Sequence, residues 1–148
     1  MLVRTTFLAL AAVGIALAIF PYKSQVCPSW HVRVVDESQR PVAGLTVRLS
    51  YQNYSAESRS HEVDVVSDDG GDAIFPAATV RVSIARRCLF TLLSAGTGVH
   101  ASFGPHAWVF AFGKGLEGTA VDPQRNVIDW TGRPSHMESV IVVKPQKP

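Results

Sequence analysis

The chain has 148 residues and a formal net charge of +2, with 47% hydrophobic and 18% charged residues. This length fits one domain with a short additional segment, and the composition excludes a disordered chain. Residues 1–25 hold two basic residues, Arg4 and Lys23, and no acidic residue, so the remainder has zero formal charge. A neutral domain argues against a dedicated nucleic-acid binder, because phosphate recognition needs a basic stripe.

The N-terminal segment contains an apolar run. Residues 5–20 carry no charge, and they follow Arg4 and precede Lys23. This pattern is typical of a secretory signal peptide or a signal anchor. Ala16-Leu17-Ala18 offers a small-x-small cleavage site, whereas the run is slightly short of the roughly 20 residues that span a bilayer. Cleavage and retention therefore both remain open.

We divide the chain into a signal peptide or signal anchor, residues 1–25, and one domain, residues 26–148. Positive charge before the apolar run favours an N-terminus that stays inside. The domain is therefore predicted to be extracytoplasmic, either membrane-anchored or secreted into the periplasm or medium. If the segment is uncleaved, residues 5–20 contact the membrane.

Two cysteines are present, Cys27 and Cys88. In an oxidising compartment an even number permits one disulfide. The alternative is two unpaired, buried thiols, and the sequence does not decide between them. No spacing of cysteine and histidine indicates a zinc site.

Apolar residues alternate with polar ones along most of the domain. A period of two predicts strands with one buried face, and the intervening turns rich in Asp, Gly and Pro predict an antiparallel β-sandwich. The expected strands include Trp30–Val34, Leu45–Tyr51, Val63–Val65, Val80–Ile84 and a late apolar run, Val140–Val143.

One segment breaks this period and predicts a helix. Within Arg86–Ala95, leucines recur at helical spacing, and Gly96 follows as a terminator. The next apolar segment, His106–Phe112, is apolar on both faces of a strand. Such a strand needs cover, which we expect from the helix, with a second chain or a membrane surface as alternatives. One of its faces carries Trp108, Phe110 and Phe112.

Charged residues gather on strand faces as well. Glu62 and Asp64 share one face, while Arg33, Arg48 and Arg81 lie on other strands. We interpret them as cross-strand ion pairs on a solvated sheet face, each contributing about 0.2–1 kcal/mol, rather than as an acid–base site.

Two stretches carry a family resemblance. Residues 34–49 follow the pattern V-x-D-x-x-G-x-P-V-x-G-A-x-V-x-L, with Gln39 in place of the first glycine, and residues 67–75 follow T-D-x-x-G-x-x-x-F. These stretches resemble carboxypeptidase regulatory-like domains, over about residues 30–86. The resemblance implies an all-β fold: a transthyretin-like (prealbumin-like), seven-stranded antiparallel β-sandwich with one short helix after the fifth strand. Here an N-terminal apolar helix precedes it.

The motif residues have structural roles. A proline presets φ in a turn, glycines supply positive φ or tight entry to a strand, and aspartates accept backbone N–H bonds. They stabilise a fold and perform no chemistry. These turn residues are Asp36, Pro41, Gly44, Asp68, Gly70 and Gly71.

The known enzymes of this fold, the hydroxyisourate hydrolases, resemble H-V-x-D near the start and end in Tyr-Arg-Gly-Ser. Here Arg33 stands three residues before Asp36, and the chain ends in Lys144–Pro148. We therefore predict no catalytic residues, cofactor or metal. A small hydrolase or metal-dependent enzyme stays an alternative through His100, His106 and His136, or through Ser102 with His100 or His106.

The predicted function is a non-catalytic, extracytoplasmic protein-interaction or structural module. Its expected interaction surface is Trp108, Phe110 and Phe112, and its partner is an envelope protein or a second copy, because transthyretin-like proteins often pair through strand edges. No nucleic-acid partner is expected. A small-ligand or carbohydrate-binding module is another alternative, with Tyr51, Tyr54 and Trp130 as candidate exposed aromatics.

Overall fold

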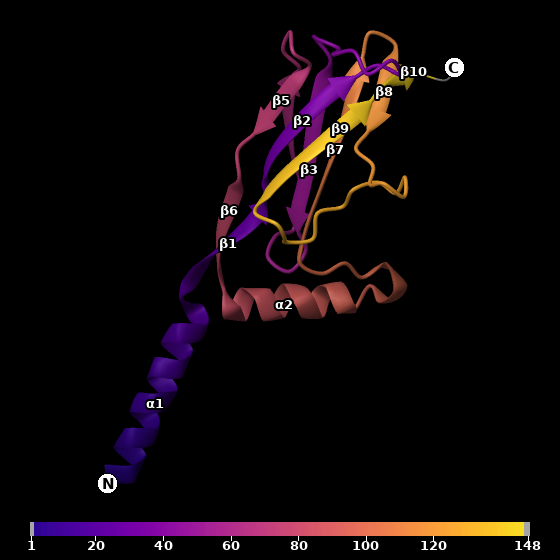
Figure 1. The fold of residues 1–148 in the computed structure, drawn as a ribbon. Helices are drawn as coiled ribbons and strands as arrows, with labels where there is room; N and C mark the ends of the chain where they lie inside the picture. Colours follow the sequence, from indigo (N-terminus) through magenta and orange to yellow (C-terminus); the bar gives the residue numbers. More distant parts are fainter. Residues whose placement is uncertain (1, 147–148) are drawn as a thin grey trace.

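The computed structural model describes residues 2–146, and β-strands are the main secondary structure (Figure 1). An apolar helix at the N-terminus precedes the strands, and a second helix lies between β6 and β7. In chain order the elements are α1 (Leu2–Ile19), β1 (Pro21–Cys27), β2 (Ser29–Val35), β3 (Thr46–Asn53), β4 (His61–Val66), β5 (Asp72–Phe75), β6 (Ala78–Ser83), α2 (Ile84–Ala95), η1 (Gly98–His100), β7 (Pro105–Gly113), β8 (Leu116–Thr119), β9 (His136–Val142) and β10 (Lys144–Pro145).

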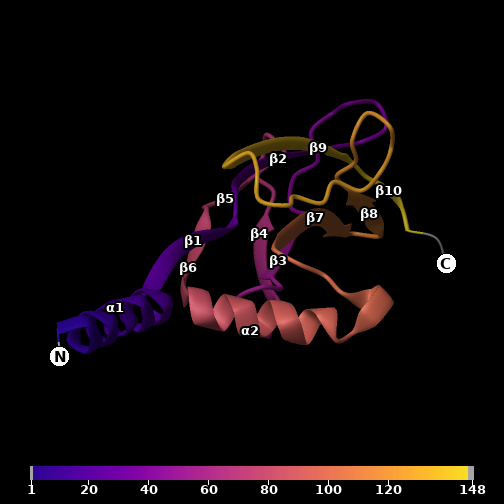
Figure 2. The same cartoon turned by 90° about the horizontal axis from the view of Figure 1, so that it is seen from below.

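Two sheets face each other across the core. One has the strand order β10-β8-β7-β3-β4 and the other has the order β5-β2-β9. The predicted β-sandwich is therefore present. Pairing is antiparallel except between β2 and β9, which run parallel. Figure 2 shows the three-stranded sheet, then the five-stranded sheet, then α2 on the outer side.

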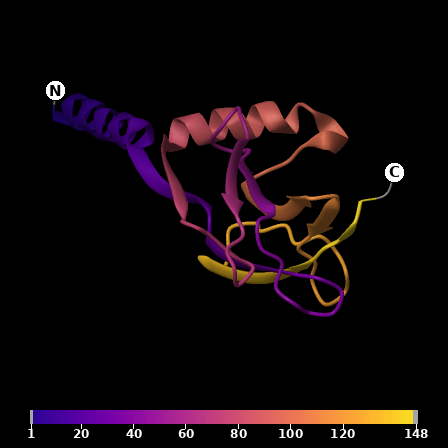
Figure 3. The same cartoon turned by 90° about the horizontal axis from the view of Figure 1, so that it is seen from above.

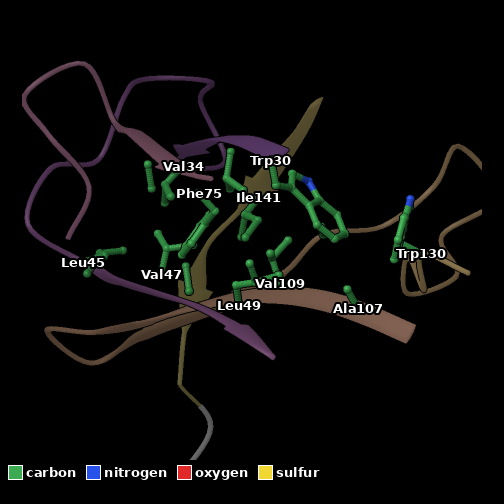
Figure 4. Packing of buried hydrophobic residues seen from close by; sticks show 14 of the residues in the cluster. Trp30, Val34, Leu45, Val47, Leu49, Phe75, Ala107, Val109, Trp130 and Ile141 are labelled. Carbon is green, nitrogen blue, oxygen red and sulfur yellow. The ribbon is translucent and has the colours of Figure 1, made fainter. Parts of the chain in front are cut away.

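The core lies between the two sheets, because alternate residues of each strand point inward. Figure 4 shows Trp30 and Ile141 from one sheet opposite Leu49 and Val109 from the other. These four side chains are at most 1% exposed. The Trp30 indole Nε1 donates to Ser139 Oγ at 2.9 Å, so its polar atom is satisfied inside the core.

A two-stranded ribbon of β1 and β6 joins the sandwich to the helices. The strands are antiparallel, with Pro21 opposite Ser83 and Lys23 opposite Arg81. Because β1 follows α1 and β6 precedes α2, the two helices leave the ribbon at the same end. The sequence pattern does not predict β1 (Pro21–Cys27), which crosses the expected boundary at residue 25.

The two predicted turns form as their aspartates require. Asp36 Oδ1 accepts the backbone N–H groups of residues 38 and 40, at 2.7 and 2.9 Å. Asp68 Oδ1 accepts those of residues 70 and 72, both at 2.9 Å. Gly71 and Gly44 have positive φ, 77° and 74°, whereas Gly70 does not, so that part of the prediction is wrong. Gln39, which replaces the family's glycine, has φ 63°.

The predicted helix is present as α2, and it begins two residues earlier than expected. Ser83 caps it, with Oγ accepting the Arg86 N–H at 3.2 Å. None of its twelve residues, all of which the structure describes, is buried. Trp108, Phe110 and Phe112 nevertheless remain partly exposed, so α2, which lies on the outer side of this sheet, covers the outer face of β7 only in part.

The two cysteines are free. Cys27 is fully buried at the end of β1, and burial raises its pKa to about 12. Cys88 is exposed on α2. The disulfide alternative is not realised, and of the two thiols only Cys27 is buried.

The N-terminal helix projects away from the sandwich (Figures 1 and 3). Its large apolar side chains are exposed from Phe7 to Ile19, as Leu8 and Ile15 illustrate at 67% and 60%. Among residues 2–146 the structure contains no helix with the length and apolar character required to cross a membrane.

Candidate functional site

The outer face of the five-stranded sheet carries a row of aromatic rings. Alternation along β7 places Ala107, Val109 and Ala111 in the core, at 0–1% exposure. Trp108, Phe110 and Phe112 point the other way and are partly exposed. We call these three residues the aromatic stripe. They are the surface that the sequence predicts, and β7 brings them together on one face.

Neighbouring strands fix the surroundings of the stripe. The register places Ser50 opposite Trp108, Arg48 opposite Phe110 and Thr46 opposite Phe112. The Phe110 and Phe112 rings stack with centroids 5.8 Å apart. The Arg48 guanidinium lies 5.3 Å from the Phe112 centroid, within the range of a cation–π contact. The stripe is therefore held by cross-strand contacts of the sheet.

Arg48 also binds two carboxylates on β4. Its Nε and Nη2 donate to the Asp64 carboxylate at 2.7 and 2.8 Å, and Nη1 lies 3.0 Å from Glu62 Oε2. This bidentate hydrogen bond between Arg48 and Asp64 lowers the pKa of Asp64 and raises the pKa of Arg48. The predicted cross-strand ion pairs are thus present for Arg48, and they form a charged border along one side of the stripe. Arg33 pairs with a different carboxylate, that of Asp72.

On the opposite side, β8 and β10 form the border. The register sets Glu117 opposite both Phe112 and Lys144. A shallow hollow opens here, lined by residues that include Phe110, Phe112, Glu117, Thr119 and Lys144. The face thus combines a partly exposed aromatic centre with charged residues on both sides.

His106 and His136, two of the three candidate metal-binding histidines, contact different partners. His106 Nδ1 lies 2.7 Å from Asp129 Oδ2, and its Nε2 lies 3.1 Å from the Phe103 carbonyl oxygen. His136 contacts Ser29 Oγ and Glu138 instead. Across the described side chains there is no group of three or more His, Cys, Asp and Glu residues placed to hold a metal. The His100 side chain lies outside the described residues.

The alternative nucleophile–base pair of Ser102 and His106 is not assembled. Both ring nitrogens of His106 contact other acceptors, so neither is directed at Ser102. The Ser102 carbonyl accepts a hydrogen bond from Ser94 Oγ at 2.8 Å, which fixes the loop against α2. These contacts stabilise the loop between α2 and β7.

The candidate carbohydrate-binding aromatics are largely inside the fold. Trp130 is 2% exposed, and its Nε1 donates to the Pro134 carbonyl at 2.6 Å, so its expected exposure is wrong. Tyr51 is half-buried and stacks on His61, and burial raises its pKa. Tyr54 packs edge-on against His106. The three rings therefore offer no flat exposed platform.

One charged cluster on the other sheet was missed. Asp72 accepts bonds from His31 Nε2 at 3.0 Å and from Arg33 Nε at 3.2 Å. The Arg33 bond, followed by the His31 bond, lowers the pKa of Asp72. The β2–β5 register, which places Arg33 opposite Asp72, brings the cluster together, and it joins residues 39 positions apart. The sequence offers no local signal for that pairing.

Comparisons with known proteins give no family. No family model matches the chain, and no curated protein matches it. Among solved structures, the chain is similar to 3-chlorocatechol 1,2-dioxygenase from Rhodococcus opacus 1CP, at 14% identity and a TM-score of 0.42. The match covers 87% of this chain and 64% of that chain. A likeness this weak supports no inference about fold or function.

Proposed function

We propose that this chain is a non-catalytic, extracytoplasmic interaction module that binds a protein partner through the aromatic stripe. The observation that carries the proposal is the row of partly exposed rings, Trp108, Phe110 and Phe112, on a sheet face that α2 does not seal. Single exposed apolar residues are ordinary, whereas a contiguous aromatic row bordered by charge is typical of interaction surfaces.

The composition of this face fits a protein interface. Binding hot spots are enriched in Trp, Tyr and Arg and are surrounded by a polar rim. Trp108 and Arg48 lie on this face, and Asp64 and Glu117 border it. Because Arg48 is held by two carboxylates and stacks on Phe112, little side-chain freedom is lost when a partner binds.

The fold and location that we propose for this module are those of a carboxypeptidase regulatory-like, transthyretin-like domain outside the cytoplasm. Its support is the two turn motifs, in which Asp36 and Asp68 accept backbone N–H bonds and Gly71 adopts positive φ. Support for the location is the uncharged run at residues 5–20. The motifs are structural, so they are compatible with a binding module and supply no catalytic group.

Mild crosslinking of the tagged full-length chain in its native envelope, followed by affinity capture, tests the proposal. We expect a protein at near-stoichiometric yield, either an envelope protein or a second copy, and Trp108→Ala should weaken its binding at least tenfold. Ile74→Ala is the matched control, since Ile74 is 67% exposed on the other sheet.

Circular dichroism checks that both variants remain folded. Equal capture by the wild type, Trp108→Ala and Ile74→Ala would contradict binding through the stripe. Recovery of the monomer alone would contradict the interaction module itself.

A further inference from the structure

The amphipathic helix α2 is oriented with its apolar side away from the protein. Its three leucines are among the most exposed apolar residues of the chain, with Leu89 at 55%, Leu92 at 71% and Leu93 at 60%. Its partly buried side is the more polar one and consists of Arg87, Phe90, Thr91 and Ser94. Surface helices ordinarily bury the apolar stripe and expose the polar one. The reversed orientation indicates that something outside this chain covers α2.

The exposed side of α2 adjoins a second exposed apolar element. The ribbon places the start of α2 beside the end of α1, because Pro21 pairs with Ser83, and the two helices are in contact. Figures 1 and 2 show both helices at the same end of the molecule. On α1, large apolar residues from Phe7, at 72% exposure, to Ile19, at 62%, are uncovered. The two helices therefore present one extended apolar surface.

The charge at this end is positive. The segments that build it, residues 2–27 and 78–95, contain no acidic residue. Lys23 and Arg81 face each other on the ribbon, and Arg86 follows in the first turn of α2. All three are exposed. Glu57 lines a hollow with Arg81 and Arg86, and its carboxylate bonds to His61.

We propose that α2 lies flat on a lipid bilayer, with Leu89, Leu92 and Leu93 among the acyl chains. Lys23, Arg81 and Arg86 then contact anionic headgroups. Apolar residues on one side of a helix with basic residues nearby are the signature of interfacial membrane binding. The inference rests on the membrane-attached form of the proposed function and is independent of its protein partner.

A lipid surface accounts for both helices more simply than a protein partner does. Residues 7–19 of α1 are all uncharged and apolar, and nearly all of them are exposed, so a protein would have to enclose this part of the helix. Lipid covers such a helix without shape complementarity. Because α2 adjoins α1 in the fold, lipid that reaches α1 also reaches the apolar side of α2.

A native cysteine on α2 provides a labelling site for testing this lipid contact. Cys88 is exposed on α2, one residue before Leu89, whereas Cys27 is fully buried. An environment-sensitive fluorophore can therefore be attached at Cys88 of the full-length protein. The labelled protein is mixed with vesicles of phosphatidylcholine and phosphatidylglycerol, and flotation reports total membrane binding. We expect a blue shift of the fluorophore and quenching by spin-labelled lipid.

A double variant, Leu92→Glu with Leu93→Glu, distinguishes membrane contact by α2 from membrane binding through α1. We expect it to float with vesicles through α1 but to lose the blue shift and the lipid quenching. The matched control is Val66→Glu with Ile74→Glu, which places the same charges at positions that are 62% and 67% exposed on the sandwich. This control should retain both signals.

The possible results discriminate between the proposals. Flotation without a shift at Cys88 would overturn lipid contact by α2 and leave the membrane attachment standing. Failure of the chain to float would overturn both the attachment and the contact. A shift that appears without vesicles as protein concentration rises would overturn lipid contact in favour of a second copy on α2.

Discussion

The sandwich and the helical end of this molecule place similar apolar residues in opposite environments. In β3, Val47 and Leu49 point at the facing sheet and are 0% and 1% exposed. In α2, Leu92 and Leu93 point away from the protein and are 71% and 60% exposed. The sandwich thus provides the burial of its own apolar residues, whereas the helical end depends on an external surface. Hydrophobicity alone therefore does not say what a residue is buried against.

The largest effect should come from the core. Trp30→Ala removes a fully buried indole and its bond to Ser139, and we expect a loss of about 3–5 kcal/mol in the free energy of unfolding. Leu92→Ala removes an apolar side chain from the exposed side of α2, so in solution it should change that free energy by less than about 0.5 kcal/mol. Denaturant titration of both variants measures the two losses in the free energy of unfolding. Equal losses would contradict the difference between the core and α2.

Two glycines give a second, smaller contrast. A Cβ at Gly71 would lie 2.5 Å from the Val34 carbonyl oxygen, and φ is +77°. At Gly98, φ is +65° but nothing lies within 4 Å. Gly98→Ala should therefore cost no more than about 1–2 kcal/mol, from backbone strain, and Gly71→Ala should cost more. Thermal unfolding measures both, and a larger loss in Gly98→Ala would contradict the sandwich packing described here.

The smallest expected effect is the pH dependence of stability that Asp72 contributes. Hydrogen bonds from Arg33 and His31 lower the pKa of Asp72. A carboxyl whose folded pKa lies below its unfolded value of about 3.9 stabilises the fold above that pH. That contribution is lost as the pH falls through the lower, folded pKa. Asp72→Asn should therefore destabilise the protein at neutral pH, and its difference from the wild type should vanish in strong acid.

Denaturant titrations across acidic pH measure this loss. Asp69→Asn is the control, because it removes the same charge from an exposed position in the neighbouring turn. If Asp69→Asn reproduced the pH profile of Asp72→Asn, net charge rather than the bonds of Asp72 would be the cause.

Local patterns were enough to predict much of the sandwich. Period-two alternation identified strands around Trp30 and Leu49, a run apolar on both faces identified the strand around Val109, and the leucine spacing identified α2. The bonds of Asp36 and Asp68 were predictable because each acceptor serves N–H groups within four residues. Such features depend on neighbouring residues in the sequence, which a single chain displays.

Features that depend on distant pairing were not predictable. The sequence of β1 shows no alternation of apolar and polar residues, and β1 directly follows the apolar run of α1. It becomes a strand through its pairing with β6. The burial of Trp130 depends on its bridge to Ala107. The reversed orientation of α2 depends on the ribbon that sets its direction.

For the candidate site, the aromatic stripe followed from the alternation of β7. The charged border of the stripe was predictable only in part. The sequence predicts the pairing of Arg48 with Asp64, but it does not predict the stacking of Arg48 on Phe112. The pairing of His106 with Asp129 spans 23 residues and has no local signature.

The two native cysteines report directly on the contrast between the sandwich and the helical end, because Cys27 belongs to the core and Cys88 to the outward side of α2. The most direct test is the reaction of the native, unreduced full-length chain with a thiol reagent, followed by mass spectrometry of the labelled peptides. Cys88 should react readily, and Cys27 should react only after denaturation. Protection of Cys88 in the absence of lipid, or labelling of both thiols in the native chain, would contradict the account.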